Sequence, residues 1–321
     1  MKHAIRFLQS TLICGMACGM SNATAQDFPV KPIRIVTGGA GGGNDVLARL
    51  IGVGLTASWG QQVVVDNRPS GVIPGEITTR AQPDGYTLVL SGASFWISPL
   101  FVEKPPYDPV RDFSPITLPV STPNILAISP SLPVKNVKDL IALAKARPGE
   151  LNYGTPGAGS SPHLGGELFK AMAGVNIVRI NYKSATTSIS EVIAGQIQMT
   201  FGNAASVAPH ARSGRIKALA VTSAQPSALF PDLPTIAATG LPGYEMLSLF
   251  GIFGPPKMPE AIVDKLNREI VRVISRAEVK DLLANAGIEV VGSSPAQLAT
   301  SIKAEVAKWS KVIKDAGIRS E

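Results

Sequence analysis

Short apolar runs alternate with amphipathic segments along most of the chain. Ile33–Thr37, Gln62–Val65 and Thr87–Leu90 have the length and aliphatic content of buried strands. Between the first two runs, apolar residues recur at helical spacing from about 45 to 59, which predicts a helix with one buried face. Alternating strands and helices are typical of an α/β fold.

The same alternation continues to the C-terminus. Further strands are predicted at Ile125–Ile128, Leu151–Tyr153, Val178–Tyr182, Gln198–Phe201, Lys217–Thr222 and Phe250–Phe253. Helices are predicted over 137–146, 162–173, 189–194 and about 260–275 and 295–315. The proline-rich stretch 99–123 is interpreted as a connection.

Composition narrows the functional classes. A chain of 321 residues with 45% hydrophobic content suggests two domains with a buried core. The formal net charge of +7 comes from 30 basic and 23 acidic residues, without a basic block. Nucleic acid is therefore not an expected partner.

Residues 1–25 have the features of an export signal. Lys2 and Arg6 precede an apolar run, and Ala23 and Ala25 suit cleavage after Ala25. The run is too short and too interrupted for a good membrane-spanning helix. We expect cleavage of this signal and a periplasmic location, with an ordinary N-terminal helix as the alternative.

Both cysteines, Cys14 and Cys18, lie inside the predicted signal. The mature chain then has no thiol, which excludes disulfides, cysteine nucleophiles and zinc–sulfur sites. Lipidation of Cys18 stays open, although the residues before it suit a lipoprotein site poorly. No later apolar run is long enough to span a membrane, so we expect a soluble mature protein.

A glycine loop at 38–45 separates the first predicted strand from the first predicted helix. Asn44 and Val46 stand where dinucleotide-binding patterns need glycine, and Asn44-Asp45 replaces the Lys-Ser/Thr of a phosphate loop. The loop can still present backbone N–H groups to a carboxylate at a helix start. Asp45 is interpreted as a cap more readily than as a ligand contact.

A second glycine loop, at 154–161, repeats this arrangement, with Ser161 as a plausible N-cap before Pro162. Both loops could also be packing turns. Their positions in separate halves of the chain favour a cleft that binds an anion from two sides.

No catalytic, metal or cofactor site is predicted. The mature chain has two histidines, His163 and His210, and neither belongs to a cluster with metal-ligand spacing. There is also no Gly-x-Ser-x-Gly motif. We interpret His163 as a residue that positions the second loop rather than as a general base.

Several motifs along the chain resemble those of one family. They include Lys31-Pro32-Ile33-Arg34-Ile35-Val36, Gly60-Gln61-Gln62-Val63-Val64-Val65-Asp66-Asn67-Arg68, Pro83-Asp84-Gly85-Tyr86-Thr87-Leu88, Tyr107-Asp108-Pro109 and Leu233-Pro234-Thr235. The chain is similar in these motifs to Bug/TctC-type receptors, the extracytoplasmic solute-binding proteins of tripartite tricarboxylate transporters. The resemblance covers residues 28–318.

The resemblance implies an α/β fold of the two-lobe periplasmic-binding-protein type (type II-like, Venus flytrap). Lobe one is expected to comprise 27–125 plus 251–321, and lobe two 126–250. The family usually has an aromatic residue where Gly38 stands, and its absence is expected to widen the pocket or remove a contact.

The loops and the resemblance together predict one set of ligand-binding residues. It comprises Thr37, Gly38, Gly41, Gly42, Gly43, Asn44, Asp45, Ser91, Gly92, Ala93, Thr155, Gly157, Ala158, Gly159, Ser160, His163, Asn203 and Ala204. The resemblance implies a monomeric receptor that captures a small organic acid, without a cofactor, and delivers it to an inner-membrane permease. The alternatives are a ligand-sensing partner of a membrane sensor kinase, and a secreted hydrolase or lyase.

Overall fold

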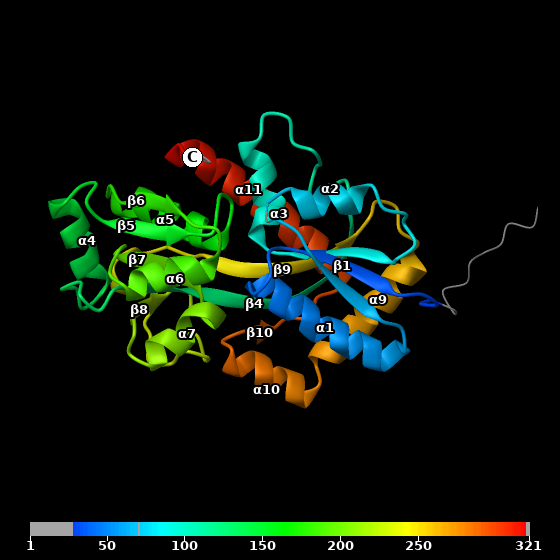
Figure 1. The fold of residues 1–321 in the computed structure, drawn as a ribbon. Coiled ribbons are helices and arrows are strands. Elements are labelled where there is room, and N and C mark those ends of the chain that lie inside the picture. The colour runs from blue at the N-terminus through cyan, green and yellow to red at the C-terminus, as the bar shows by residue number, and fades with distance from the viewer. Residues whose placement is uncertain (1–27, 70, 319–321) are drawn as a thin grey trace, which may run out of the picture.

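The computed structural model describes residues 28–69 and 71–318, so the predicted export signal lies outside the described residues. Two groups of strands lie next to each other and share the long strand β4 (Ser114–Ile128) (Figure 1). In the first lobe the order is β2-β1-β3-β9-β4, with β10 on the other edge of β4. Its other strands are β1 (Ile33–Thr37), β2 (Val63–Asn67), β3 (Thr87–Ser91), β9 (Leu247–Gly254) and β10 (Glu289–Val290).

The second lobe is built on the end of β4. There β4 pairs with β7 and β8, and the sheet continues from β7 through β5 to β6. The strands are β5 (Asn152–Thr155), β6 (Val178–Asn181), β7 (Met199–Asn203) and β8 (Lys217–Val221). In the first lobe β1 pairs in parallel with β2 and β3, and in the second lobe β5 pairs in parallel with β6 and β7, as expected for strand–helix–strand units.

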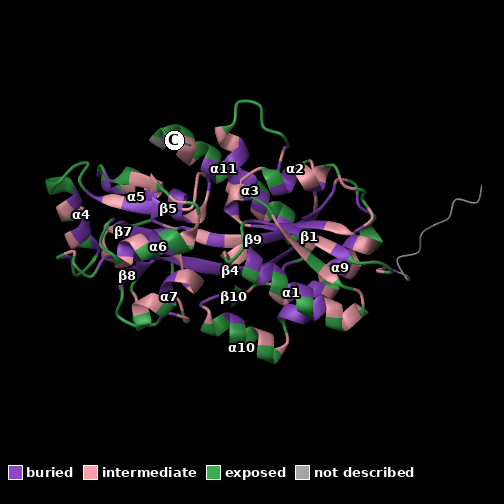
Figure 2. Ribbon diagram, in the orientation of Figure 1, coloured by how far each residue is buried: buried purple, intermediate pink, exposed green. Residues whose placement is uncertain are grey.

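Helices cover the sheets of both lobes, and their outer faces are exposed while the strands are largely buried (Figure 2). The first lobe has α1 (Gly43–Trp59), α2 (Ile73–Thr79), α3 (Ala93–Ile97), the 3-10 helix η1 (Ser98–Phe101), α9 (Glu260–Ile274), α10 (Ala277–Asn285) and α11 (Pro295–Ala316). The second has α4 (Val137–Ala146), α5 (Ser161–Ala173), α6 (Ala185–Ile193), α7 (Ala204–Arg212) and α8 (Ile236–Thr239). None of the helices within the described residues is both long and apolar enough to cross a membrane.

Helix α1 shows how the sequence pattern produces the packing. Leu47, Ile51 and Leu55 recur at helical spacing and are fully or almost fully buried against the sheet. The helix ends at Gly60, whose φ of 68° is the left-handed conformation that favours glycine at a helix C-terminus. The predicted helix over about 45–59 is therefore confirmed.

The two lobes are joined by β4 and β9, which pair antiparallel and run between them (Figure 1). β4 pairs with β9 up to Pro123, and from Asn124 onward it pairs with β7. The predicted lobe boundaries fall inside these two strands, after Ile125 in β4 and after Phe250 in β9. The interpretation of 99–123 as a connection is wrong from Ser114 onward, because β4 begins there.

Candidate ligand-binding site

The ends of five parallel strands lie around one cavity between the lobes. In the first lobe, loops after β1 and β3 lead into α1 and α3, and in the second, loops after β5, β6 and β7 lead into α5, α6 and α7. Ligands of open α/β sheets bind at the carboxyl ends of the strands, where loops meet helix N-termini. Both lobes contribute such strand ends here, so loops and helix N-termini lie on both sides of the cavity.

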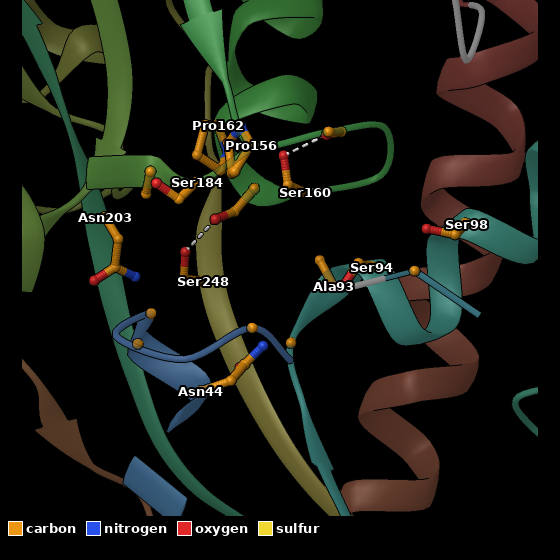
Figure 3. Close-up of a pocket in the computed structure, with 18 of the residues that line it drawn as sticks. Asn44, Ala93, Ser94, Ser98, Pro156, Ser160, Pro162, Ser184, Asn203 and Ser248 are labelled. Atoms are coloured by element: carbon orange, nitrogen blue, oxygen red, sulfur yellow. Dashed lines mark hydrogen bonds between the residues drawn. The ribbon is translucent and has the colours of Figure 1, made fainter. Parts of the chain in front are cut away.

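The cavity has a volume of about 600 Å³ and is lined by both glycine loops. Ten residues of the predicted set line it: Gly41, Gly42, Gly43, Asn44, Gly92, Ala93, Gly157, Ala158, Ser160 and Asn203. Figure 3 shows Asn44 and Ala93 on the first-lobe side, facing Ser160 and Asn203 of the second lobe. The two loops thus face one shared cavity.

A hydrogen bond links η1 of the first lobe to the second glycine loop at this cavity. The hydroxyl of Ser98 donates to the carbonyl oxygen of Ala158 at 3.3 Å. A Cβ atom on Gly159, whose φ is +72°, would lie 2.8 Å from Ser98 Oγ. Glycine at 159 therefore permits the close approach of η1 to the second loop.

The other eight predicted residues do not line the cavity: Thr37, Gly38, Asp45, Ser91, Thr155, Gly159, His163 and Ala204. Several of them anchor the loops from behind. Thr37 Oγ1 donates to Leu90 O at 2.8 Å, and Asn67 Nδ2 donates to Gly38 O at 2.9 Å. Ser91 and Ala204 are buried among the ends of their strands and helices.

Asp45 stabilises the first loop from inside α1. The N-cap of α1 is Gly42 and makes no side-chain hydrogen bond, so the interpretation of Asp45 as the helix cap is corrected. Asp45 instead accepts hydrogen bonds from Gly41 N–H and Asn67 Nδ2, each at 2.9 Å, and pairs with Arg49. Burial raises the pKa of Asp45, but these hydrogen bonds outweigh it and leave the pKa below its ordinary value.

His163 stabilises the second glycine loop from inside α5, as Asp45 stabilises the first loop from inside α1. Its fully buried ring accepts a hydrogen bond from Gly159 N–H at Nδ1 (3.0 Å), and Nε2 lies 2.6 Å from Arg179 Nη1. Burial, followed by the charge of Arg179, lowers the pKa of His163 to about 4. The imidazole is therefore neutral at pH 7, as its acceptor role at Nδ1 requires.

These anchors use some of the backbone donors that the glycine loops were expected to offer a ligand. Gly41 N–H is taken by Asp45 and Gly159 N–H by His163, while Gly157 N–H bonds to Thr155 Oγ1 at 3.2 Å. Other N–H groups at the cavity have no partner within the described protein, among them those of Gly43, Asn44, Ala158 and Ser161. The first two open α1 and the last opens α5, where helix geometry leaves N–H groups unpaired.

Much of the lining lies outside the predicted set of residues, although Gly39, Ala40, Pro156 and Ser161 belong to the two glycine loops. The additional residues are Gly39, Ala40, Gly71, Val72, Ser94, Ser98, Phe101, Val102, Pro156, Ser161, Pro162, Lys183, Ser184, Ala185, Thr186, Ser206, Ser248, Leu249 and Phe250. For the lining residues 183–186 the sequence held a usable signal. They follow the predicted strand that ends at Tyr182, and a loop and a helix come after this strand, as they do after the strands that precede the two glycine loops. For Val72 and Phe101 the sequence held no comparable signal.

The floor and walls combine apolar and hydroxyl groups. Phe250 lies on β9 against α1, so that a Cβ atom on Gly43 would contact its ring at 3.5 Å. Next to it, Ser248 Oγ hydrogen-bonds to Ser161 Oγ at 2.6 Å and to Asn124 Oδ1 at 2.6 Å (Figure 3). Among the described residues, no group of three or more His, Cys, Asp or Glu is placed to hold a metal.

Comparisons with known proteins identify the family. Residues 47–318 match the family model described as the tripartite tricarboxylate transporter family receptor. The chain is 34% identical to Protein BugT of Bordetella pertussis over 304 residues, covering 92% of each chain.

Solved structures give the same result. A structure described as R. palustris Rpa4515 with adipate has a TM-score of 0.86 and 36% identity, covering 91% of this chain and 99% of that one. A structure of the periplasmic binding protein BugD has a TM-score of 0.85 and 28% identity, covering 92% and 100%. The expected two-lobe periplasmic-binding fold is confirmed, and the chain belongs to the Bug/TctC family of solute-binding receptors.

Proposed function

We propose that this receptor captures a small organic acid as its carboxylate, between the two lobes, and releases it chemically unchanged. The observation that carries this proposal is the cavity itself. The N-termini of α1, α5, α6 and α7 open onto it, and no lining residue in the described chain is acidic. Helix N-termini attract anions through unpaired N–H groups and the helix dipole.

The carboxylate would lie between the glycine loops. Its oxygens would accept hydrogen bonds from the unpaired N–H groups of Gly43 and Asn44 on one side and of Ala158 and Ser161 on the other. Ordered water would complete the remaining hydrogen bonds. The structure described with adipate, at 36% identity, supports a carboxylic acid as the ligand class.

Binding is expected to close the lobes about β4 and β9. A ligand held by both glycine loops favours the closed form over the open one, which shifts the population toward closure. In the proposed role the receptor is exported by the signal at 1–25, is monomeric, and presents the closed form to an inner-membrane permease. Lobe one would comprise 27–125 plus 251–321, and lobe two 126–250.

The proposal is tested with the purified mature chain. Denaturation followed by mass spectrometry would identify any copurified acid, and thermal-shift assays would screen carboxylates, amino acids and uncharged amides. A carboxylate should raise Tm with the logarithm of its concentration once this exceeds Kd, and titration calorimetry should give one site per chain. Binding only of uncharged amides, or turnover of an added acid, would overturn the proposal.

The transport role needs a separate experiment in cells. Deletion of the receptor should abolish uptake of the labelled acid, and the permease should fail to transport it without the receptor. Unchanged uptake, together with loss of a transcriptional response to the acid, would indicate the sensing role instead.

A further inference from the structure

A second cavity lies within the second lobe, apart from the cavity between the lobes. It has a volume of about 680 Å³ and is lined by parts of β4, α7 and β8 and by the segment 229–233. None of the described residues lines both cavities. A volume of this size is within the range of pockets that hold small organic ligands, so the second cavity can take a molecule of its own.

The inner wall of the second cavity is apolar. Ile125 of β4, Ala208 of α7, Ile216 and Phe230 line it, and the exposed fraction of each is 8% or less. A ligand that fills this part of the cavity removes apolar surface from water, which favours a hydrocarbon group there.

The first lobe holds this wall in position. A Cβ atom on Gly287, in the turn between α10 and β10, would lie 2.4 Å from Cζ of Phe230, so the ring packs directly against the turn. Thr122 Oγ1 of β4 donates to Gly287 O at 2.7 Å, which fixes the turn to the strand. Because the wall is held before a ligand arrives, less ordering is required on binding.

The charged side chains at the second cavity favour an anion. The described lining contains two cations, Arg212 and Lys217, and one carboxylate, that of Asp232. Lys217 Nζ donates to Val134 O at 2.6 Å. Arg212 Nη1 donates to Asn285 O at 3.4 Å, and the other N–H groups of this guanidinium have no partner within the described protein. They are therefore available to a carboxylate.

We propose that the second cavity binds a monocarboxylate with a hydrocarbon chain, of the size of a medium-chain fatty acid. The chain lies against Phe230 and the carboxylate contacts Arg212. This site is separate from the proposed carboxylate site between the lobes and does not depend on it.

The hydrocarbon chain supplies most of the affinity. Each methylene group that enters the apolar part should raise the affinity about three- to fourfold. Arg212 is exposed, so water and salt screen its attraction for the carboxylate. We expect this contact to contribute about a threefold gain in affinity.

The test uses titration calorimetry on the purified mature chain, with hexanoate, octanoate and decanoate as probes. The affinity should rise about tenfold with each added pair of methylene groups. Octan-1-ol has the chain of octanoate without the charge. Arg212→Gln should therefore weaken octanoate about threefold and leave the affinity for octan-1-ol unchanged. Arg215→Gln is the matched control, because Arg215 is an exposed arginine outside the lining and its loss should change neither affinity.

A second variant places the acid in this cavity. Ala211 lies on α7, is partly exposed and lines the second cavity, so a tryptophan at this position would extend into it. Ala211→Trp should weaken decanoate by at least about 30-fold. Ala57→Trp is the control, because Ala57 is exposed on α1 and lines neither cavity, and this variant should bind decanoate as the unmodified protein does.

Gly42→Asp distinguishes the two cavities, because it adds a negative charge to the lining of the cavity between the lobes. This variant should retain its affinity for decanoate. Loss of decanoate binding in Gly42→Asp, with retention in Ala211→Trp, would place the acid between the lobes and overturn the proposal. Failure of the unmodified protein to bind decanoate would overturn it as well. If Ala211→Trp does not fold, as judged by circular dichroism, Arg212→Gln decides: equal changes for octanoate and octan-1-ol would overturn the carboxylate assignment.

Discussion

The backbone N–H of Gly159 donates a hydrogen bond to Nδ1 of His163 at 3.0 Å, inside the second lobe. This bond fixes the glycine loop to the helix that follows it. Because the acceptor must be unprotonated, the geometry of a ligand-facing loop depends on a neutral imidazole. Burial of the ring, followed by the charge of Arg179 next to Nε2, lowers the pKa of the imidazole and keeps it neutral.

The stability of the protein should therefore decrease as the pH is lowered through a defined range. The pKa of His163 is about 4 in the folded protein and about 6.5 when unfolded, so the unfolded chain gains the proton first as pH falls. The contribution of His163 is fully present above about pH 6.5, decreases below it, and is lost once the pH falls through about 4. Between pH 7 and about pH 5, the expected loss in free energy of unfolding is about 2 kcal/mol.

Urea denaturation at a series of pH values measures this loss. His163→Asn keeps an acceptor oxygen near the position of Nδ1, but its side chain does not titrate. Between pH 7 and about pH 5, this variant should therefore lose about 2 kcal/mol less free energy of unfolding than the unmodified protein. His210, whose pKa is also lowered, is present in both proteins and cancels in the comparison. Parallel pH profiles for the two proteins would contradict the prediction.

Gly42→Asp should separate binding from folding. Gly42 is the N-cap of α1 in an extended conformation, a position where aspartate is favoured, so the variant should fold with unchanged or higher Tm. Its carboxylate would place a negative charge at the proposed anion site, and the affinity for a carboxylate ligand should fall about 100-fold.

Gly42→Ala is the control for this variant. A Cβ at this position has Gly39 O at 3.4 Å as its contact, which is ordinary packing. The alanine variant should therefore lose much less affinity than the aspartate variant in calorimetric titration. Equal affinities of the two variants for the acid would show that the loop does not bind the anion.

The sequence predicts most of the regular elements, because their apolar periodicity is undisturbed. β4 is the main exception. Pro115, Pro119 and Pro123 lie within it, and proline is a strong signal against a central strand because it lacks the N–H that pairing requires. The strand accommodates them through irregular register: its pairing with β9 shifts between Pro115 and Val120. Such tertiary compensation leaves no local pattern in the sequence.

The candidate site likewise combines local features, which the sequence predicts, with contacts between distant segments, which it does not. A strand, a glycine loop and a helix N-terminus are local features, so both glycine loops could be placed correctly on a shared cavity. Thr155 and His163 entered the ligand-binding set through the family resemblance, but their side chains make hydrogen bonds that anchor the loop. For His163 this is the positioning role that the sequence also suggested. Phe101 and Ser248 reach the cavity only through the packing of distant segments.

Gly54 marks a close contact between α1 and α9. A Cβ at this position would lie 2.2 Å from Cγ1 of the buried Val273. Although alanine is the better helix former, Gly54→Ala should lower the free energy of unfolding by about 1–3 kcal/mol through overpacking. Combining it with Val273→Ala should relieve the clash, so that the double variant loses less stability than the sum of the single variants. Additive losses in chemical denaturation would contradict this close approach.

The hydrogen bond from Ser98 to Ala158 O spans the cavity from one lobe to the other. We expect Ser98→Ala to destabilise the closed arrangement relative to an open one, because opening the lobes separates these two atoms. Ligand affinity should fall about 2- to 10-fold, the range expected for one neutral hydrogen bond. Ser190→Ala is the control, because Ser190 is an exposed serine on α6 with no side-chain hydrogen bond in the described structure, and this variant should bind the ligand normally.

Small-angle X-ray scattering gives a second measurement. The ligand-free Ser98→Ala variant should show a larger radius of gyration than the unmodified protein. If both radius and affinity stay unchanged, the contact between Ser98 and Ala158 does not contribute to closure.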